Sequence, residues 1–175
     1  MQTSRFLVTG GSQGAIAINQ AVSAWLDGGV EGLIVLWATG KGSYARFSRH
    51  HRPPSVQVFD FLDPMADGYA VADVVVARAG MMTGAELCAW GLPSVLIPLP
   101  TAAADHQTYN ARALQAAGAA ELLLQSELTP ERLRRTVLEL MADGERRRRM
   151  AEAARNRGKP DAVTEIVSRL LTLAR

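Results

Sequence analysis

Short, continuously apolar segments alternate with helical patterns along most of this chain. The apolar segments span residues 6–9, 33–38, 56–59, 74–77, 95–98 and 121–124. Runs this short, without regularly spaced polar positions, are typical of strands that are covered on both faces. Because each intervening helix returns the chain to the start of the next strand, the alternation predicts an α/β fold with a doubly wound parallel sheet.

The helical patterns between these segments lie at residues 15–26, 44–49, 65–72, 83–90 and 107–117. After Thr129 the pattern becomes helical only. Thr129 followed by Pro130 is typical of a helix start, because threonine caps free N–H groups and proline suits the first helical position. That helix is predicted to reach about residue 142, and two more are predicted at 145–157 and 162–173. We therefore expect one domain over residues 1–175, with an all-helical end from about residue 129.

Length, charge and cysteine content narrow the class of protein. A chain of 175 residues is long enough for one domain with a proper core. The net charge of +2 argues against nucleic-acid binding. The arginines at 146–149, 155 and 157 spread around a helix, which favours a solvated face over a lipid or phosphate patch. The single cysteine, Cys88, excludes an intramolecular disulfide and is expected in the core. No apolar run approaches the roughly 20 residues that span a bilayer, and no signal peptide is apparent.

The loops after the predicted strands are where a ligand is expected, since doubly wound sheets bind ligands at the carboxyl ends of their strands. The first loop, Gly10-Gly11-Ser12-Gln13-Gly14, leads directly into a helix. Glycines permit close approach of the backbone, and the helix start offers N–H groups and a favourable dipole to a phosphate. Such a turn also serves simply to reverse the chain. The later loops carry glycine or polar residues too, which favours the functional interpretation.

Three ordered sequence blocks resemble one enzyme family. They are Thr9-Gly10-Gly11-Ser12-Gln13-Gly14-Ala15 with Asn19-Gln20; Ala72-Asp73 through Arg78-Ala79-Gly80 with Thr83, Glu86 and Ala89-Trp90-Gly91-Leu92-Pro93; and Asp105-His106-Gln107 with Asn110-Ala111 and Ala117-Gly118-Ala119-Ala120. In this order and spacing the chain resembles, over almost its whole length, the C-terminal donor-binding half of the MurG family. Those enzymes transfer GlcNAc from UDP-GlcNAc to lipid I in peptidoglycan synthesis. The resemblance implies a Rossmann-like domain that forms one half of a GT-B glycosyltransferase.

The resemblance also implies a set of UDP-GlcNAc contacts. The diphosphate is expected at Gly11, Ser12 and Gln13 and, at a second helix start, at Gly80 and Thr83. Glu86 is expected to accept hydrogen bonds from the ribose hydroxyls. The spacing from Thr83 to Glu86 also fits a capping box on a helix that starts at Thr83.

The remaining expected contacts have structural alternatives as well. Phe61 and Leu62 would hold the uracil, or pack in the core. Arg78 would touch the base or order its loop, or form a structural ion pair. Gln107 and Asn110 would read the sugar hydroxyls, with His106 a weaker candidate.

Two departures from the family pattern stand out. Trp37-Ala38 occurs where the family usually has His-Gln, which removes two polar groups from the loop at Thr39-Gly40. Ala79 replaces a residue that is often small and polar. His50-His51 is interpreted as part of a solvated loop, and no spacing of His, Cys and Asp suggests a metal site. No cofactor is expected beyond UDP-GlcNAc, the donor substrate.

The family's N-terminal acceptor domain, which carries the catalytic base and the membrane-facing surface, has no counterpart in these residues. We therefore expect no catalytic residue in this chain, binding of UDP-GlcNAc, and no transfer by the chain alone. It is interpreted as a shortened enzyme or as the donor subunit of a split UDP-GlcNAc transferase that reaches lipid I through its partner. The full enzyme is expected in the cytoplasm, peripheral to the inner face of the membrane.

Other hypotheses remain open. A non-catalytic UDP-sugar-binding module fits the same residues. A dinucleotide enzyme is disfavoured, because the first loop lacks the G-x-G-x-x-G register and no acidic residue closes the second strand. The last predicted helix carries an apolar stripe, formed by Val163, Ile166, Val167, Leu170 and Leu171. This stripe is expected to fold back on its own domain, to form a homodimer, or to stay exposed; in the family the last helix reaches the N-terminal domain.

Overall fold

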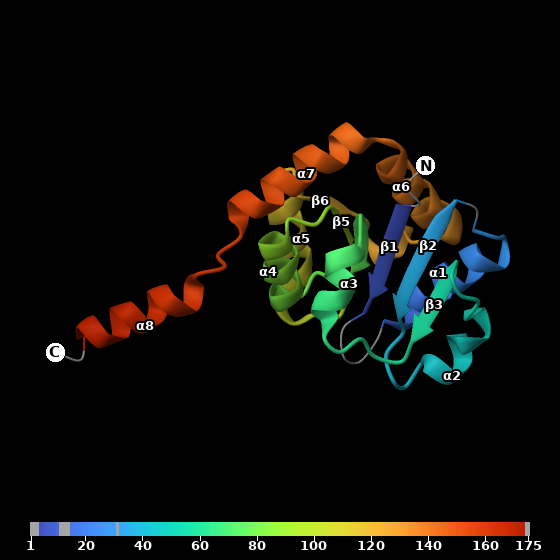
Figure 1. The fold of residues 1–175 in the computed structure, drawn as a ribbon, viewed down its shortest axis with the longest axis horizontal. Coiled ribbons are helices and arrows are strands. Elements are labelled where there is room, and N and C mark those ends of the chain that lie inside the picture. Colours follow the sequence, from blue (N-terminus) through green and yellow to red (C-terminus); the bar gives the residue numbers. More distant parts are fainter. Residues whose placement is uncertain (1–3, 11–14, 31, 174–175) are drawn as a thin grey trace.

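The computed structural model describes residues 4–10, 15–30 and 32–173. Its centre is a six-stranded sheet with the order β3-β2-β1-β4-β5-β6, in which every neighbouring pair is parallel (Figure 1). This arrangement confirms the predicted α/β class. The strands are β1 (Ser4–Thr9), β2 (Leu33–Ala38), β3 (Val56–Phe59), β4 (Val74–Ala77), β5 (Ser94–Leu96) and β6 (Ala120–Leu122).

The last two strands are shorter than predicted. β5 ends at Leu96 and β6 at Leu122, two residues before the ends expected from the apolar runs. Two backbone hydrogen bonds continue the pairing beyond these ends, from Leu123 N to Leu96 O at 3.0 Å and from Ile97 N to Ala77 O at 2.8 Å. Pro98 has no N–H to extend the ladder further. The apolar runs therefore reflect burial beyond the strand ends as well as strand pairing.

Helices cover both faces of the sheet. They are α1 (Ile16–Asp27), α2 (Tyr44–Phe47), α3 (Met65–Val71), α4 (Met81–Trp90), α5 (His106–Ala116), α6 (Pro130–Ala142), α7 (Gly144–Arg157) and α8 (Ala162–Leu173). Short 3-10 turns lie at Ser48–His50, Ala103–Asp105 and Gln125–Glu127. The α-helix positions match the sequence prediction closely, with one difference at the start of α4 that changes the interpretation of the site.

Adjacent residues of a strand serve opposite cores. Phe6 packs with α1 and α6 in one cluster, and its ring stacks on Trp25 with the centroids 5.0 Å apart. Leu7, the next residue, packs with α3, α4 and α5 in the other cluster. Both side chains are fully buried. Burial of both faces explains why the strands are uninterrupted apolar runs rather than alternating ones.

In the helical C-terminal part, α6 and α7 pack against the α/β body, whereas α8 does not. Thr129 caps α6 as predicted, and its hydroxyl accepts a hydrogen bond from Arg132 N at 3.1 Å. α7 packs against α4. The arginines of α7 are not all solvated: Arg146 forms an ion pair with Glu121, and Arg147 donates to carbonyl groups in the last turn of α6. The predicted solvated face is therefore wrong for these two residues.

The final helix stands apart from the rest of the molecule. None of its described residues is buried, and Figure 1 shows α8 extending away from the sheet. The apolar stripe is open, with Ile166 57% and Leu170 59% exposed. The structure rules out the first of the three alternatives for this stripe, folding back on its own domain, and leaves the homodimer and the exposed stripe open. Among the described helices, none is long and apolar enough to cross a membrane.

The two singled-out residues outside the site have contrasting outcomes. Cys88 is buried on α4, as predicted. His50 is not part of a solvated loop: its side chain is 4% exposed, and its Nε2 lies 2.8 Å from Ser23 Oγ in a buried hydrogen bond. Two adjacent histidines look polar in the sequence. Only the folded chain shows that the 3-10 turn at Ser48–His50 places His50 against Ser23 of α1 and Trp37 of β2. His51 is exposed and bonds through Nδ1 to the backbone of Val58.

Candidate functional site

The reversal of strand order lies between β1 and β4, which are central neighbours in the sheet. The chain winds outward through β2 and β3 on one side and through β5 and β6 on the other. In this architecture the carboxyl ends of such a central pair are the usual ligand position. Gly80, the residue before α4, lies in the loop that follows the carboxyl end of β4. Gly11, Ser12 and Gln13, which follow β1 in the chain, lie outside the described residues.

The helix after β4 begins earlier than predicted. Its first residue is Met81, and Gly80 is the cap with φ −64° and ψ 150°. Thr83 is therefore the third residue of the helix, so the capping-box interpretation is wrong. No side chain caps this helix start. The unpaired N–H groups of the first turn and the positive end of the helix dipole are consequently free to meet an anion.

Glu86 lies on α4, beyond its first turn, and its side chain is exposed. Its Oε2 accepts a hydrogen bond from the phenol of Tyr69 at 2.8 Å. Tyr69 comes from α3 and is 4% exposed. Burial, and then the hydrogen bond to Glu86, raise the pKa of Tyr69, so the phenol is a donor throughout the physiological range. A buried tyrosine needs a hydrogen-bond partner, but the sequence does not reveal which residue supplies it.

Arg78 orders the loops around it. Its Nη1 donates to the carbonyls of Ile97 and Pro98 at 3.1 and 3.0 Å, and its Nη2 donates to Gln125 Oε1 at 2.7 Å. Burial lowers the pKa of Arg78 from its ordinary value, although the guanidinium remains charged. Of the three sequence interpretations of Arg78, loop ordering is the one that these contacts display, and no ion pair of Arg78 is found among the described residues.

Gln107 and Asn110 lie on the first turns of α5 and tie it to neighbouring loops. Gln107 Oε1 accepts from Leu99 N at 3.0 Å, and Asn110 Nδ2 donates to Ala79 O at 3.1 Å. Within the described part of the chain, Gln107 Nε2 and Asn110 Oδ1 have no hydrogen-bond partner. Each amide is thus oriented by one end and has the other end available. His106 is exposed and bonds to Ala103 O at 2.8 Å.

The backbone just before α5 adopts an unusual conformation. Ala104 and Asp105 both lie in the left-handed region, with φ of 48° and 53°. Two successive non-glycine residues in this region cost of order 1–3 kcal/mol each, and such strain clusters at functional sites. The sequence gives little signal for this feature: aspartate adopts the left-handed region more readily than most residues, but alanine does not.

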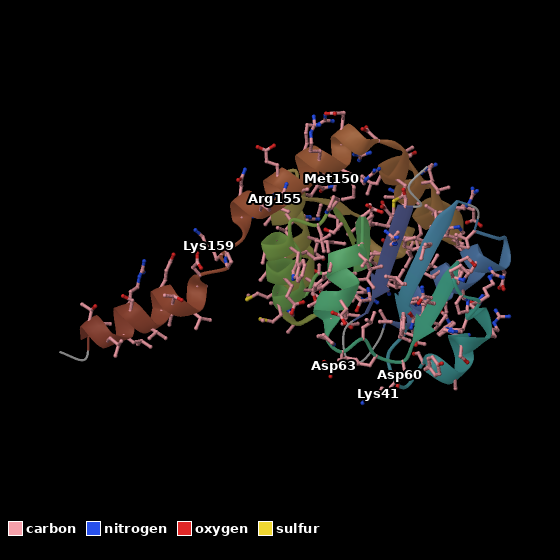
Figure 2. All side chains as sticks on the ribbon, viewed as in Figure 1. Lys41, Asp60, Asp63, Met150, Arg155 and Lys159 are labelled. Carbon is pink, nitrogen blue, oxygen red and sulfur yellow. The ribbon has the colours of Figure 1, made fainter. Side chains whose placement is uncertain are left out.

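Phe61 and Leu62 follow β3 and have different environments. Phe61 is 41% exposed, so the core-packing alternative is wrong for it. Lys41 Nζ, from the loop after β2, lies 5.9 Å from the centroid of the Phe61 ring. Figure 2 labels Lys41, Asp60 and Asp63 together at this edge of the sheet. Leu62 is half-buried and packs against the cluster beneath α3, as its core alternative predicts.

Trp37, which departs from the family pattern, has a structural role in this chain. Trp37 is fully buried, and its indole Nε1 donates to Asn19 Oδ1 at 2.9 Å. Asn19 Nδ2 in turn donates to Thr39 O at 2.8 Å. Asn19, one of the block residues, therefore connects α1 to the loop after β2. Asp73, another block residue, accepts a hydrogen bond from Arg5 N at 2.7 Å and joins β4 to β1.

A cavity of about 340 Å³ adjoins the site between α4, α5 and the start of the connector to α8. Its lining includes Gly80 and Asn110 as well as Cys88, Arg157 and Lys159. Figure 2 shows Arg155 and Lys159 along this end of α7. Within the described ranges, no group of three or more His, Cys, Asp or Glu side chains is arranged to hold a metal ion.

Residues 5–166 match the glycosyltransferase family 28 C-terminal domain. The chain is 42% identical to the UDP-N-acetylglucosamine--N-acetylmuramyl-(pentapeptide) pyrophosphoryl-undecaprenol N-acetylglucosamine transferase of Desulfitobacterium hafniense strain Y51, covering 96% of this chain and 48% of that protein. It is 44% identical to the enzyme of the same description from Salinibacter ruber, covering 96% and 46%. The chain thus spans about half the length of these curated relatives.

The solved structures agree with the sequence relatives. The crystal structure of Acinetobacter baumannii MurG superposes with a TM-score of 0.86 and 32% identity, over 98% of this chain and 50% of that one. A parallel six-stranded sheet followed by C-terminal helices is therefore common to both.

Proposed function

Because this chain belongs to glycosyltransferase family 28, as a C-terminal domain of the MurG family, we propose that it binds UDP-GlcNAc as the sugar donor for peptidoglycan synthesis. The domain is one half of a GT-B arrangement. The observation that carries the proposal is the pairing of two features on α4: an uncapped helix start at Gly80 and an exposed carboxylate at Glu86. Both lie beside the reversal of strand order.

The diphosphate is assigned to the N-termini of two helices. Gly11, Ser12 and Gln13 precede α1, and Gly80 and Thr83 lie at the start of α4. These two helices follow the neighbouring strands β1 and β4, and the N–H groups and positive dipole end of a helix start suit an anion without a metal ion. Glu86 is assigned to the ribose, because a carboxylate accepts hydrogen bonds from two neighbouring hydroxyls.

The remaining two parts of the donor, the uracil and the GlcNAc, are assigned to residues on either side of the diphosphate and ribose contacts. Phe61 and Leu62 are assigned to the uracil, which stacks on an exposed ring and bonds to backbone groups. Gln107 and Asn110 are assigned to the GlcNAc hydroxyls through the amide ends that have no protein partner among the described residues. Arg78 contributes by holding the loops after β4 and β5 in place.

The reaction we propose for the complete enzyme is inverting. An acceptor hydroxyl of lipid I displaces UDP from the anomeric carbon in one step, while a base on the acceptor side takes the proton. This domain stabilises the charge that develops on the departing diphosphate. The base is assigned to an N-terminal half or a partner chain, together with the contact to the cytoplasmic face of the membrane. The domain is expected to be inactive alone.

Calorimetric titration with UDP-GlcNAc, UDP and NADH tests donor binding. Saturable binding of both uridine nucleotides, at least tenfold weaker in Glu86→Ala, is expected. Removal of charge-assisted hydrogen bonds in a desolvated site costs about 1.4 kcal/mol or more, which corresponds to that factor. Binding of NADH in preference to UDP-GlcNAc would identify a dinucleotide domain instead.

A second experiment separates a donor domain from a non-catalytic binding module. The chain is mixed with the separately expressed N-terminal half of the Salinibacter ruber relative, UDP-GlcNAc and a soluble lipid I analogue. Transfer by the mixture and none by either part supports a donor half. Transfer by this chain alone contradicts the proposed division of labour. Binding without transfer in any mixture favours the module.

A further inference from the structure

We propose that Tyr69 is a positioning residue that holds the Glu86 carboxylate in the orientation required to accept the ribose hydroxyls. Tyr69 does not itself contact the nucleotide. This inference rests on the proposed function, since it takes Glu86 as the ribose ligand. Neither the sequence blocks nor the comparisons assign a role to Tyr69.

The contact joins a fixed donor to a mobile acceptor. Tyr69 is 4% exposed and belongs to the core cluster beneath α3 and α4, with its ring 6.2 Å from that of Trp90. Glu86 is exposed, and a glutamate on a helix surface samples several rotamers when nothing holds it. Within the described part of the chain, the phenol of Tyr69 is the only hydrogen-bond partner of Glu86. The rigid residue therefore determines where the carboxylate points.

The hydrogen bond leaves the carboxylate able to bind a diol. Tyr69 occupies one lone pair of Oε2, and an ionised carboxylate offers about four such sites. Oε1 and the second lone pair of Oε2 are left for two hydroxyls. Desolvation keeps the phenol protonated, so it remains a donor while the carboxylate is ionised. Tyr69 thus acts only as a hydrogen-bond donor, and the Glu86 carboxylate keeps acceptor sites for the ligand.

The position of Tyr69 in the chain gives the contact a second consequence. α3 begins at Met65, directly after the loop that carries Phe61 and Leu62. The same short helix therefore follows the loop assigned to the base and supplies the hydroxyl that orients the group assigned to the ribose. Tyr69 links these two subsites through one rigid element.

The test compares UDP with 2′-deoxy-UDP in the variant Tyr69→Phe, which removes the hydroxyl and keeps the ring. In the unchanged chain, UDP is expected to bind about tenfold more tightly than 2′-deoxy-UDP, since one hydroxyl-to-carboxylate hydrogen bond is lost. In Tyr69→Phe this ratio should fall at least about threefold, with 2′-deoxy-UDP affinity within about twofold of the original. A merely structural loosening would weaken both ligands alike and leave the ratio unchanged.

The controls keep the outcomes distinct. Glu86→Gln should lower the ratio as well, and Tyr69→Phe combined with Glu86→Gln should lower it no further. Tyr44→Phe removes the hydroxyl of a tyrosine at the start of α2 that makes no hydrogen bond to Glu86 among the described residues, and should leave the ratio unaltered. Glu86→Asp retains the charge but withdraws the carboxylate from Tyr69, and should reproduce the loss even if Tyr69→Phe does not fold.

A normal ratio in folded Tyr69→Phe, with a lowered ratio in Glu86→Gln, overturns the role of Tyr69 while the proposed function stands. A normal ratio in Glu86→Asp likewise counts against the positioning role. Failure of the unchanged chain to bind UDP, or to discriminate it from 2′-deoxy-UDP, contradicts the ribose assignment and the role of Tyr69 together.

Discussion

At the scale of single residues, Arg78 has the most extensive set of contacts in the candidate site. It donates to two carbonyls at the end of β5 and to Gln125, while half-buried. Arg78→Ala leaves these acceptors without their charged donor and is expected to lower the free energy of unfolding by about 2 kcal/mol. Urea denaturation measures this change. Arg112→Ala, an exposed position on α5, is the control and should change stability by less than about 0.5 kcal/mol.

His50 predicts a dependence of stability on pH. Burial first, and the neighbouring Arg49 second, lower its pKa below 6.5, outweighing the opposing effect of Asp27. In the range below pH 6.5 the unfolded chain then binds more protons at this position than the folded one. The contribution of the neutral, buried imidazole is complete above pH 6.5 and is lost as the pH falls toward the folded pKa.

Urea titrations at pH 7.5 and 5.5 check this expectation. Stability should fall between the two pH values, and His50→Gln should make the fall smaller. His106→Gln replaces an exposed histidine and should leave the fall as it was. An identical pH dependence in His50→Gln and the unchanged chain would show that the titrating group lies elsewhere.

Sequence reasoning singles out residues that stand in recognisable blocks better than residues whose importance lies in a contact with a distant residue. Glu86 and Arg78 stand in such a block. Tyr69 and the Trp37–Asn19 contact were not identified, since their partners are 17 and 18 positions away and meet only in the folded chain. For Arg78 the sequence left several interpretations open, and only the contacts with the loops after β5 and β6 display loop ordering. For Phe61, exposure excludes the core-packing alternative.

At the scale of elements, the two ends of α4 show where boundaries are and are not predictable. The start was misplaced because Gly80 caps the helix without a side chain, so the Thr83–Glu86 spacing was the more visible signal. The end is defined by Gly91 in the left-handed conformation, with φ of 64°. Its N–H bonds to Cys88 O, and that of Leu92 to Leu87 O, which closes the last turn.

Two glycine-to-alanine variants in this region are expected to act in opposite directions. An alanine at position 91 would have to keep the left-handed backbone conformation, and its Cβ would lie 2.6 Å from Arg155 Cγ. Gly91→Ala should therefore lower the free energy of unfolding by about 1–2 kcal/mol or more. At Gly84, inside α4, a Cβ would make an ordinary 3.4 Å contact with Leu114, and Gly84→Ala should gain about 0.5–1 kcal/mol. Thermal unfolding of both variants measures the difference, and a shift of the same sign in both would refute this account.

At the scale of the whole molecule, the class of fold and the order of elements followed from the alternation of strands and helices. The strand order did not, because a parallel sheet can be wound in more than one sequence of neighbours. The exposed position of α8 was one of three alternatives. Apolar residues at helical spacing predict an apolar helix face, but they do not predict what covers that face. In the described part of this chain, nothing covers it.

The isolation of α8 makes its removal informative. Ending the chain at Lys159 is expected to leave the free energy of unfolding within about 0.5 kcal/mol, since α8 buries none of its described residues. Leu140→Ala, at a fully buried position of α6, should by contrast cost about 2–5 kcal/mol. The shortened chain should retain UDP-GlcNAc binding and lose transfer in the mixture with an acceptor half.

Light scattering and the transfer assay distinguish two partners for the apolar stripe of α8: a second copy of this chain and an acceptor half. A homodimer through α8 predicts concentration-dependent association that Ile166→Glu with Leu170→Glu abolishes. Docking on an acceptor half predicts that the same double variant impairs transfer in the mixture. A chain that is monomeric at all concentrations and transfers normally with both substitutions would leave the stripe without a role in assembly.

The connector between α7 and α8 has a practical consequence for enzyme engineering. Gly158 lies against the backbone of Cys88, where a Cβ would come within 3.0 Å of the carbonyl oxygen, so the packed body of the domain extends to that residue. Residues 159–161 then lead into a helix that makes no buried contact. A chimaera joined there would keep the packed body of this domain and take its last helix from the recipient enzyme. Under the proposed function, exchange at this junction is a route to new pairings of sugar donor and acceptor.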